Sequence, residues 1–107
     1  MSHKDFHGDC VFAMKYGLDA SCIYEYICFL FDFYKNKKKN FHDGFFWVFL
    51  SLKDFQARYP FLTYDMIREA IKKLTDGCTS HITKEFVPPV ITNRIIDGNS
   101  AYTIIWM

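Results

Sequence analysis

The chain has 107 residues, which is room for one domain, and half of them are hydrophobic. Its net charge of +1 excludes a protein that is basic throughout, so any contact with nucleic acid must come from a local patch. No apolar run in the sequence is long enough to cross a membrane. Aromatic residues make up 20% of the chain, more than a small monomer usually needs, which favours a surface covered by a second copy or a protein partner.

The N-terminal residues 1–8 are polar and predict a flexible tail, which leaves residues 9–107 as a single domain. Two pairs of possible metal ligands occur, His3 with His7 and Cys78 with His81. A metal site needs three or four converging ligands, so we expect no metal site and no cofactor. Four cysteines are scattered along the chain: Cys10, Cys22, Cys28 and Cys78. No signal peptide precedes them, which predicts reduced thiols in a cytoplasmic protein.

Residues 9–16 predict a short strand or a turn of helix, and a longer helix is expected over residues 20–35 with Asp19 as its N-cap. Six apolar positions recur at helical spacing and predict the buried stripe of this helix: Ile23, Tyr26, Ile27, Leu30, Phe31 and Tyr34. Three aromatic residues lie off that stripe: Tyr24, Phe29 and Phe33. A helix that is apolar nearly all round is either central or shared with a partner, so these three predict a homodimer or partner interface.

Four lysines stand at the end of this helix: Lys35, Lys37, Lys38 and Lys39. Lysines suit the negative end of the helix dipole, so a solvated helix end explains them, and phosphate contacts are the functional alternative. Residues 40–44 predict a loop. Residues 45–50 are aromatic and β-branched, which predicts a short strand.

Residues 51–77 predict two helices joined by a tight corner. The first helix begins after Ser51, a suitable N-cap, and ends before Pro60, because the residue before a proline is pushed out of helical geometry. Its apolar stripe consists of Leu52, Phe55 and Tyr59. Phe61 and Leu62 are left to pack in the corner.

The second helix is expected over residues 63–75, because its cap, its charges and its apolar spacing agree. Thr63 can accept a hydrogen bond from a first-turn amide, and Asp65 suits the positive end of the helix dipole. The predicted apolar face holds Met66, Ile67, Ala70, Ile71 and Leu74. Gly77 can take the left-handed conformation that stops a helix.

The rest of the chain changes to strand-like patterns. Residues 81–87 predict one strand, and two prolines interrupt the ladder after it. Residues 90–96 and 101–107 predict a hairpin around a turn at residues 97–100. The order helix, strand, helix, helix, strand, strand is that of a winged helix-turn-helix domain, an α+β fold in which a three-helix core carries a small antiparallel β-sheet.

Residues 44–77 also resemble the N-terminal domains of plasmid and phage replication initiators and of DnaD-type primosome proteins. Those domains have an aromatic strand, a serine before the first helix, a "PFL" corner, a serine or threonine cap, and an "IRxAIKKL" helix that ends in glycine. The matching residues are Trp47, Ser51, Pro60, Phe61, Leu62, Thr63, Ile67, Arg68, Glu69, Ala70, Ile71, Lys72, Lys73, Leu74 and Gly77. The resemblance covers about a third of the chain.

This resemblance implies that the helix over residues 63–75 enters the major groove of double-stranded DNA while the hairpin contacts the backbone. Arg68 is the candidate for a base contact, because a guanidinium can bind guanine through two hydrogen bonds. Thr63 and Tyr64 would reach a phosphate or a thymine methyl group. Phosphate contacts are implied for Lys72, Lys73 and Arg94.

Two features depart from the family pattern. Asp65 and Glu69 lie on the same helix face and would repel phosphate, and Cys78 and Thr79 replace the leucine and isoleucine that usually follow the helix. Two functions therefore remain open. One is a dimeric DNA-binding domain of a phage- or plasmid-type replication or regulatory protein. The other is a protein-interaction module, such as a small phage-encoded inhibitor or assembly domain.

An enzyme with a small-molecule substrate is not expected. The sequence has no glycine-rich phosphate loop, no metal-ligand set and no nucleophile with an evident base beside it.

Overall fold

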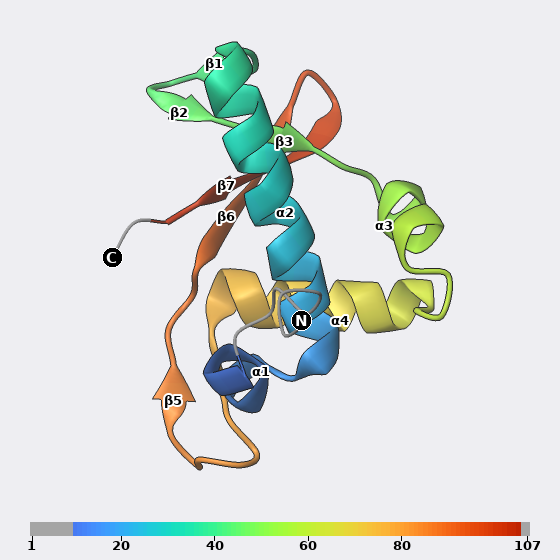
Figure 1. The fold of residues 1–107 in the computed structure, drawn as a ribbon, viewed down its shortest axis with the longest axis vertical. Helices are drawn as coiled ribbons and strands as arrows, with labels where there is room; N and C mark the ends of the chain where they lie inside the picture. Colours follow the sequence, from blue (N-terminus) through green and yellow to red (C-terminus); the bar gives the residue numbers. More distant parts are fainter. Residues whose placement is uncertain (1–9, 106–107) are drawn as a thin grey trace, which may run out of the picture.

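The computed structural model describes residues 10–105, which form four helices, a three-stranded sheet and two short hairpins (Figure 1). The helices are α1 (Cys10–Tyr16), α2 (Leu18–Lys37), α3 (Leu52–Arg58) and α4 (Tyr64–Asp76). The strands are β1 (Phe41–His42), β2 (Phe45–Phe46), β3 (Val48–Phe49), β4 (Cys78–Thr79), β5 (Phe86–Val87), β6 (Ile91–Ile96) and β7 (Asn99–Ile104). This α+β composition agrees with the sequence. The predicted tail over residues 1–8 lies outside the described range.

The longest helix, α2, stands through the middle of the molecule, and α4 crosses its lower half in Figure 1. Ile23, Ile27 and Phe31 of α2 are buried, at the spacing that turns one face of a helix toward a core. Phe55 of α3 is fully buried and packs edge-on against Tyr102 of β7, with ring centroids 5.7 Å apart. One core therefore joins the helices to the sheet. Within residues 10–105, no helix is both long and apolar enough to cross a bilayer.

The three-stranded sheet is antiparallel, with β7 in the centre between β3 and β6. β6 and β7 form a hairpin in which Ile91 pairs with Ile104. β3 pairs with the other edge of β7, with Val48 opposite Tyr102. Because β3 precedes α3 and α4 in the chain and the hairpin follows them, the sheet pairs the segments on either side of this helix pair.

Two hairpins turn on Asp-Gly pairs. The φ angles are 53° at Asp43 and 85° at Gly44 in the β1–β2 turn, and 52° at Asp97 and 79° at Gly98 in the β6–β7 turn. Positive φ at both central residues is the two-residue turn whose twist matches that of paired strands. The hairpin predicted for the end of the chain is therefore confirmed, with a tighter turn. The loop predicted over residues 40–44 is wrong only at Phe41 and His42, which form β1.

The strand predicted over residues 45–50 is divided at Trp47. The backbone amide of Trp47 donates to the carbonyl of Asn40 at 2.9 Å, and its indole Nε1 donates to the carbonyl of His42 at 3.0 Å. These bonds turn Trp47 back toward the β1–β2 hairpin. The residues before it pair with β1, and those after it pair with β7.

Both helices of the predicted pair are confirmed, and so are their caps. The Ser51 hydroxyl accepts from the amide of Asp54 while the Asp54 carboxylate accepts from the amide of Ser51, which forms a capping box. The Thr63 hydroxyl accepts from the amide of Met66 at 3.2 Å. The buried residues of α4 are Ile67, Ala70 and Leu74, with Ile71 partly buried. Met66 was expected inside but is exposed, because it lies in the first turn at the edge of the apolar stripe.

Three helix predictions change in detail. Residues 10–16 form a helix, which resolves the choice between a strand and a turn of helix. Gly17 holds the N-cap position of α2 without a side-chain cap, and Asp19 lies in the first turn, so Asp19 is not the cap. Gly77 does end α4 at positive φ, but its ψ of 173° is extended, so it does not take the left-handed helical conformation.

The strand predicted over residues 81–87 is wrong except for its last two residues. The Ser80 hydroxyl accepts from the amides of both Ile82 and Thr83, which winds the chain into a turn. Lys84 then reverses direction at a φ of 64°. The alternating pattern in the sequence therefore belongs to a turn between β4 and β5.

Candidate nucleic-acid interface

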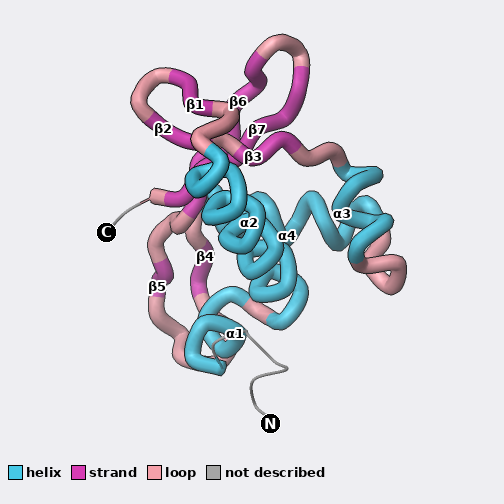
Figure 2. Tube along the Cα trace, turned by 45° about the horizontal axis from the view of Figure 1, so that its top comes forward, coloured by secondary structure: helices cyan, strands magenta, loops and turns pink. Residues whose placement is uncertain are grey.

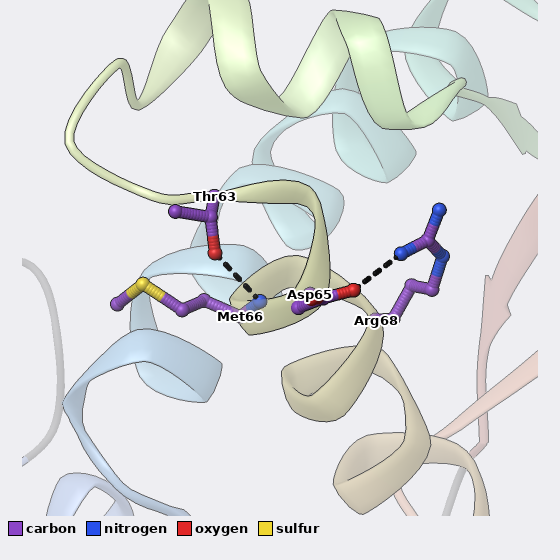
Figure 3. A network of polar contacts seen from close by, with 4 residues as sticks. All are labelled: Thr63, Asp65, Met66 and Arg68. Atoms are coloured by element: carbon purple, nitrogen blue, oxygen red, sulfur yellow. Dashed lines mark hydrogen bonds and ion pairs between the residues drawn. The ribbon is translucent and has the colours of Figure 1, made fainter.

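The exposed face of α4 begins at its first turn, beside the corner that follows α3. Tyr64, Arg68 and Lys72 are exposed and follow one another at four-residue spacing, so they form one row along the helix. Figure 3 shows the first turn of α4, where Thr63 caps the helix at the amide of Met66 and Arg68 reaches back to Asp65. The structure therefore brings together four of the residues predicted to contact DNA.

Arg68 is held by an exposed ion pair. Its Nη1 lies 2.7 Å from Oδ1 of Asp65, and the two side chains are 57% and 92% exposed. An exposed pair of this kind contributes at most about 1 kcal/mol and is screened by salt, so the guanidinium can exchange the carboxylate for a stronger partner. The whole of α4 carries three acidic and three basic residues, so the helix is neutral.

Lys73 lies on another flank of α4. It is partly buried, and its Nζ comes within 3.6 Å of the position that a Cβ on Gly17 would occupy. Lys73 shares a shallow pocket with Asp19 and Glu69, at the junction of α4 with the start of α2. This lysine therefore faces the start of α2 and is not part of the row on α4.

Arg94 belongs to the opposite end of the molecule. Its Nη1 lies 2.7 Å from Oδ2 of Asp43, and its guanidinium carbon lies 4.8 Å from the centroid of the Trp47 ring. Figure 2 shows the β1–β2 and β6–β7 hairpins projecting from the same end, where α2 finishes. Arg94 therefore joins the two hairpins and is not gathered with the residues of α4.

The three aromatic residues predicted for an interface do not share one environment. Tyr24 is partly buried and stacks on Phe12 of α1, with ring centroids 4.7 Å apart. Phe29 and Phe33 of α2 are 65% and 46% exposed. Phe33 also lies 5.5 Å from the Nζ of Lys37. Phe29 and Phe33 are thus available to a partner, whereas Tyr24 packs within the fold.

The thiols of α2 are poor nucleophiles. Burial raises the pKa of Cys28 to about 11, although a hydrogen bond with Tyr24 opposes the shift. Burial also raises the pKa of Cys22, with a further contribution from the Glu25 carboxylate. Both thiols are therefore protonated at neutral pH, and neither forms a disulfide. In the part of the chain that the structure describes, no three histidine, cysteine or acidic side chains are grouped to hold a metal ion.

Sequence reasoning missed a pocket beside Trp47. Phe45, Trp47 and Arg94 line this cavity of about 450 Å³ together with residues of β6 and β7. A signal for the hairpin was present, because the Asp43–Gly44 pair stands between two aromatic dipeptides and favours a two-residue turn. The cavity itself depends on Arg94, which the sequence places far from the turn.

No protein-family model, curated protein sequence or solved structure matches the chain. Two surfaces of the fold therefore carry the inference of function. They are the row on α4 (Tyr64, Arg68, Lys72) and the hairpin pocket (Phe45, Trp47, Arg94), whose β1–β2 hairpin follows the lysines that end α2 in the chain.

Proposed function

We propose that the chain is a winged helix-turn-helix domain that binds double-stranded DNA, with α4 as its recognition helix. The connectivity carries this proposal. In chain order, α2, β3 and the pair α3–α4 are followed by the β6–β7 hairpin. The second strand of this hairpin, β7, lies between β3 and β6 in the sheet. In this scheme the β6–β7 hairpin is the wing. The resemblance of residues 44–77 to replication initiators supports a role in phage- or plasmid-type replication or regulation.

The row on α4 supplies the chemistry for a groove contact. The major groove of DNA is about 12 Å wide and admits a helix. Arg68 would leave Asp65 and grip the edge of a guanine, which offers two acceptors to one guanidinium. Lys72 would neutralise a phosphate, and the Tyr64 hydroxyl and the Thr63 hydroxyl proton would donate to the backbone. The residues of the first turn of α4 are exposed, so the corner between α3 and α4 does not cover them.

Fluorescence anisotropy with a labelled duplex of mixed sequence at low salt tests the proposal. We expect binding that weakens steeply as salt rises, because each phosphate contact releases counterions. Arg68→Ala and Lys72→Ala should each weaken binding about tenfold. Lys15→Ala removes an exposed lysine from α1 and is the charge-matched control, which should bind as the parent protein does. Absence of binding to a pool of random duplexes at low salt contradicts the proposal.

The second candidate function is a protein-interaction module with the same fold. The neutrality of α4 and the exposure of Phe29 and Phe33 favour it. Phe29→Asp or Phe33→Asp should then abolish capture of the partner, whereas Arg68→Glu should leave capture intact. Pull-down with these variants separates the two candidates, because the DNA-binding function predicts the reverse pattern for duplex binding.

A further inference from the structure

The positive charge of the chain is concentrated where α2 ends and the β1–β2 hairpin begins. Residues 35–46 contain four lysines and one acid, a net charge of +3, whereas the whole chain carries +1. All other residues together are therefore net negative. α2 stops because Lys38 takes left-handed geometry, with φ 56° and ψ 41°, which turns the chain directly into the hairpin. This end of the molecule is consequently the most favourable place for a polyanion.

The hairpin pocket adds flat aromatic surface to this charge. Phe45 is 49% exposed, and its ring lies edge-on to Trp47 with centroids 6.5 Å apart. Arg94 lies over the Trp47 ring, so a guanidinium plane forms part of the same wall. The bond from the Trp47 amide to the carbonyl of Asn40 ties the pocket to the residue that follows the lysines. The cavity of about 450 Å³ has the size of a small-molecule site.

We propose that this pocket binds an unstacked base of a single-stranded nucleic acid, whose phosphates contact Lys37 and Lys39. The exposed ring of Phe45 and the guanidinium of Arg94 offer stacking surfaces to a base, and the lysines attract the backbone on either side of it. Aromatic platforms beside a positive track are the combination by which proteins bind single strands without reading sequence. The site is distinct from α4 and does not depend on duplex binding.

The composition of the surface favours a single strand over the other possible occupants. A base inside a duplex is stacked on both faces, so it reaches such a pocket only at the cost of unpairing. Lysine is depleted in protein interfaces, whereas here three consecutive exposed lysines, Lys37, Lys38 and Lys39, directly precede Asn40, whose carbonyl accepts from the amide of Trp47. An acidic peptide would satisfy the lysines without using the aromatic wall.

Quenching of tryptophan fluorescence by an oligothymidylate tests the site directly. The sequence has two tryptophans, Trp47 and Trp106, so Trp106→Phe leaves Trp47 as the reporter in the pocket. We expect the oligothymidylate to quench Trp47 and to bind at least tenfold more tightly than an abasic oligonucleotide of the same length. Phe45→Ala should weaken binding about tenfold, and Arg94→Lys, which keeps the charge but loses the plane, should also weaken it. Phe86→Ala, at another exposed phenylalanine (66%) on β5, should bind normally.

Each remaining outcome decides against the proposal. Equal affinity for the abasic strand means that charge alone binds the backbone and that the pocket takes no base. Normal binding by folded Phe45→Ala and Arg94→Lys has the same meaning, with folding verified by urea denaturation. Quenching by an acidic peptide but not by oligothymidylate assigns the pocket to a protein ligand. Loss of single-strand binding in folded Arg68→Ala would also contradict the proposal, because the pocket would then depend on the row on α4.

Discussion

The α3–α4 pair and the β1–β2 hairpin both present cations, but they hold them differently. On α4 the three basic residues are balanced by three acidic ones, and Arg68 is paired with Asp65. Around the hairpin four lysines meet one acid, Asp43, and that acid is already paired with Arg94. The recognition helix that we propose is thus electrically neutral, whereas the segment around the β1–β2 hairpin carries a net positive charge.

This difference shows that the topology of a fold and the distribution of its charge must be considered separately when a ligand is inferred. The connectivity of the fold indicates which helix is exposed in a way that would let it enter a DNA groove, because entry depends on the shape of the element. Electrostatic attraction acts over about 10 Å in ordinary salt and depends on where the charges lie, whatever the fold. A duplex that enters at α4 would therefore gain little attraction from α4 as a whole. The lysines at the end of α2 would attract a strand more strongly.

The largest expected effect is a loss of stability in Phe55→Ala, which tests whether the α3–α4 pair and the β1–β2 hairpin unfold as one unit. Phe55 is fully buried and packs against Tyr26 of α2 as well as Tyr102 of β7. Phe55→Ala should lower the free energy of unfolding by about 3–5 kcal/mol, because it leaves a cavity at this junction. Phe61→Ala removes the same side chain from a site that is 69% exposed and should change stability by no more than about 0.5 kcal/mol.

Urea denaturation followed by circular dichroism and by Trp47 fluorescence provides the measurement, in the Trp106→Phe background. Coincident transitions shifted to lower urea are expected for Phe55→Ala. Separate transitions for the helices and for the hairpin would show that the two surfaces fold independently.

The helix pair was predictable from the sequence because its signals are local. Ser51, Pro60 and Thr63 set the helix ends, and each acts on residues within one turn of itself. The hairpin pocket was not predictable, because Arg94 and Asp43 meet across 51 residues of chain. The orientation of the Lys73 side chain could not be predicted from the sequence either, because it depends on where α2 begins relative to α4.

A smaller loss of stability is expected from glycine substitutions, and it should differ between Gly77, which follows α4, and Gly44, which lies in the β1–β2 turn. A Cβ on Gly77 would lie 2.5 Å from the carbonyl oxygen of Val87, whereas a Cβ on Gly44 would meet no atom within 4 Å. Both glycines have φ above 80°. Gly44→Ala should therefore cost about 1 kcal/mol from backbone strain alone, and Gly77→Ala should cost at least about 2 kcal/mol. Thermal unfolding measures both, and equal losses would contradict a tight contact between α4 and β5.

The smallest expected effect is a change in binding affinity that tests whether α4 and the hairpin pocket are separate binding sites. Asp43→Asn and Asp65→Asn each remove one negative charge from an exposed ion pair while keeping the shape of the side chain. Asparagine tolerates the positive φ at residue 43, so the turn should persist. Freeing an arginine from such a pair should tighten binding about threefold, in keeping with the small energy of exposed pairs.

The two variants should act on different ligands. Asp43→Asn should tighten binding of oligothymidylate and leave the duplex affinity unchanged, because it frees Arg94 in the hairpin pocket. Asp65→Asn should tighten duplex binding alone, because it frees Arg68 on α4. Anisotropy titrations with both probes at one salt concentration measure all four values. Because both variants change the net charge equally, a general electrostatic effect would raise both affinities in both proteins. That result would mean that the two surfaces are parts of one diffuse field.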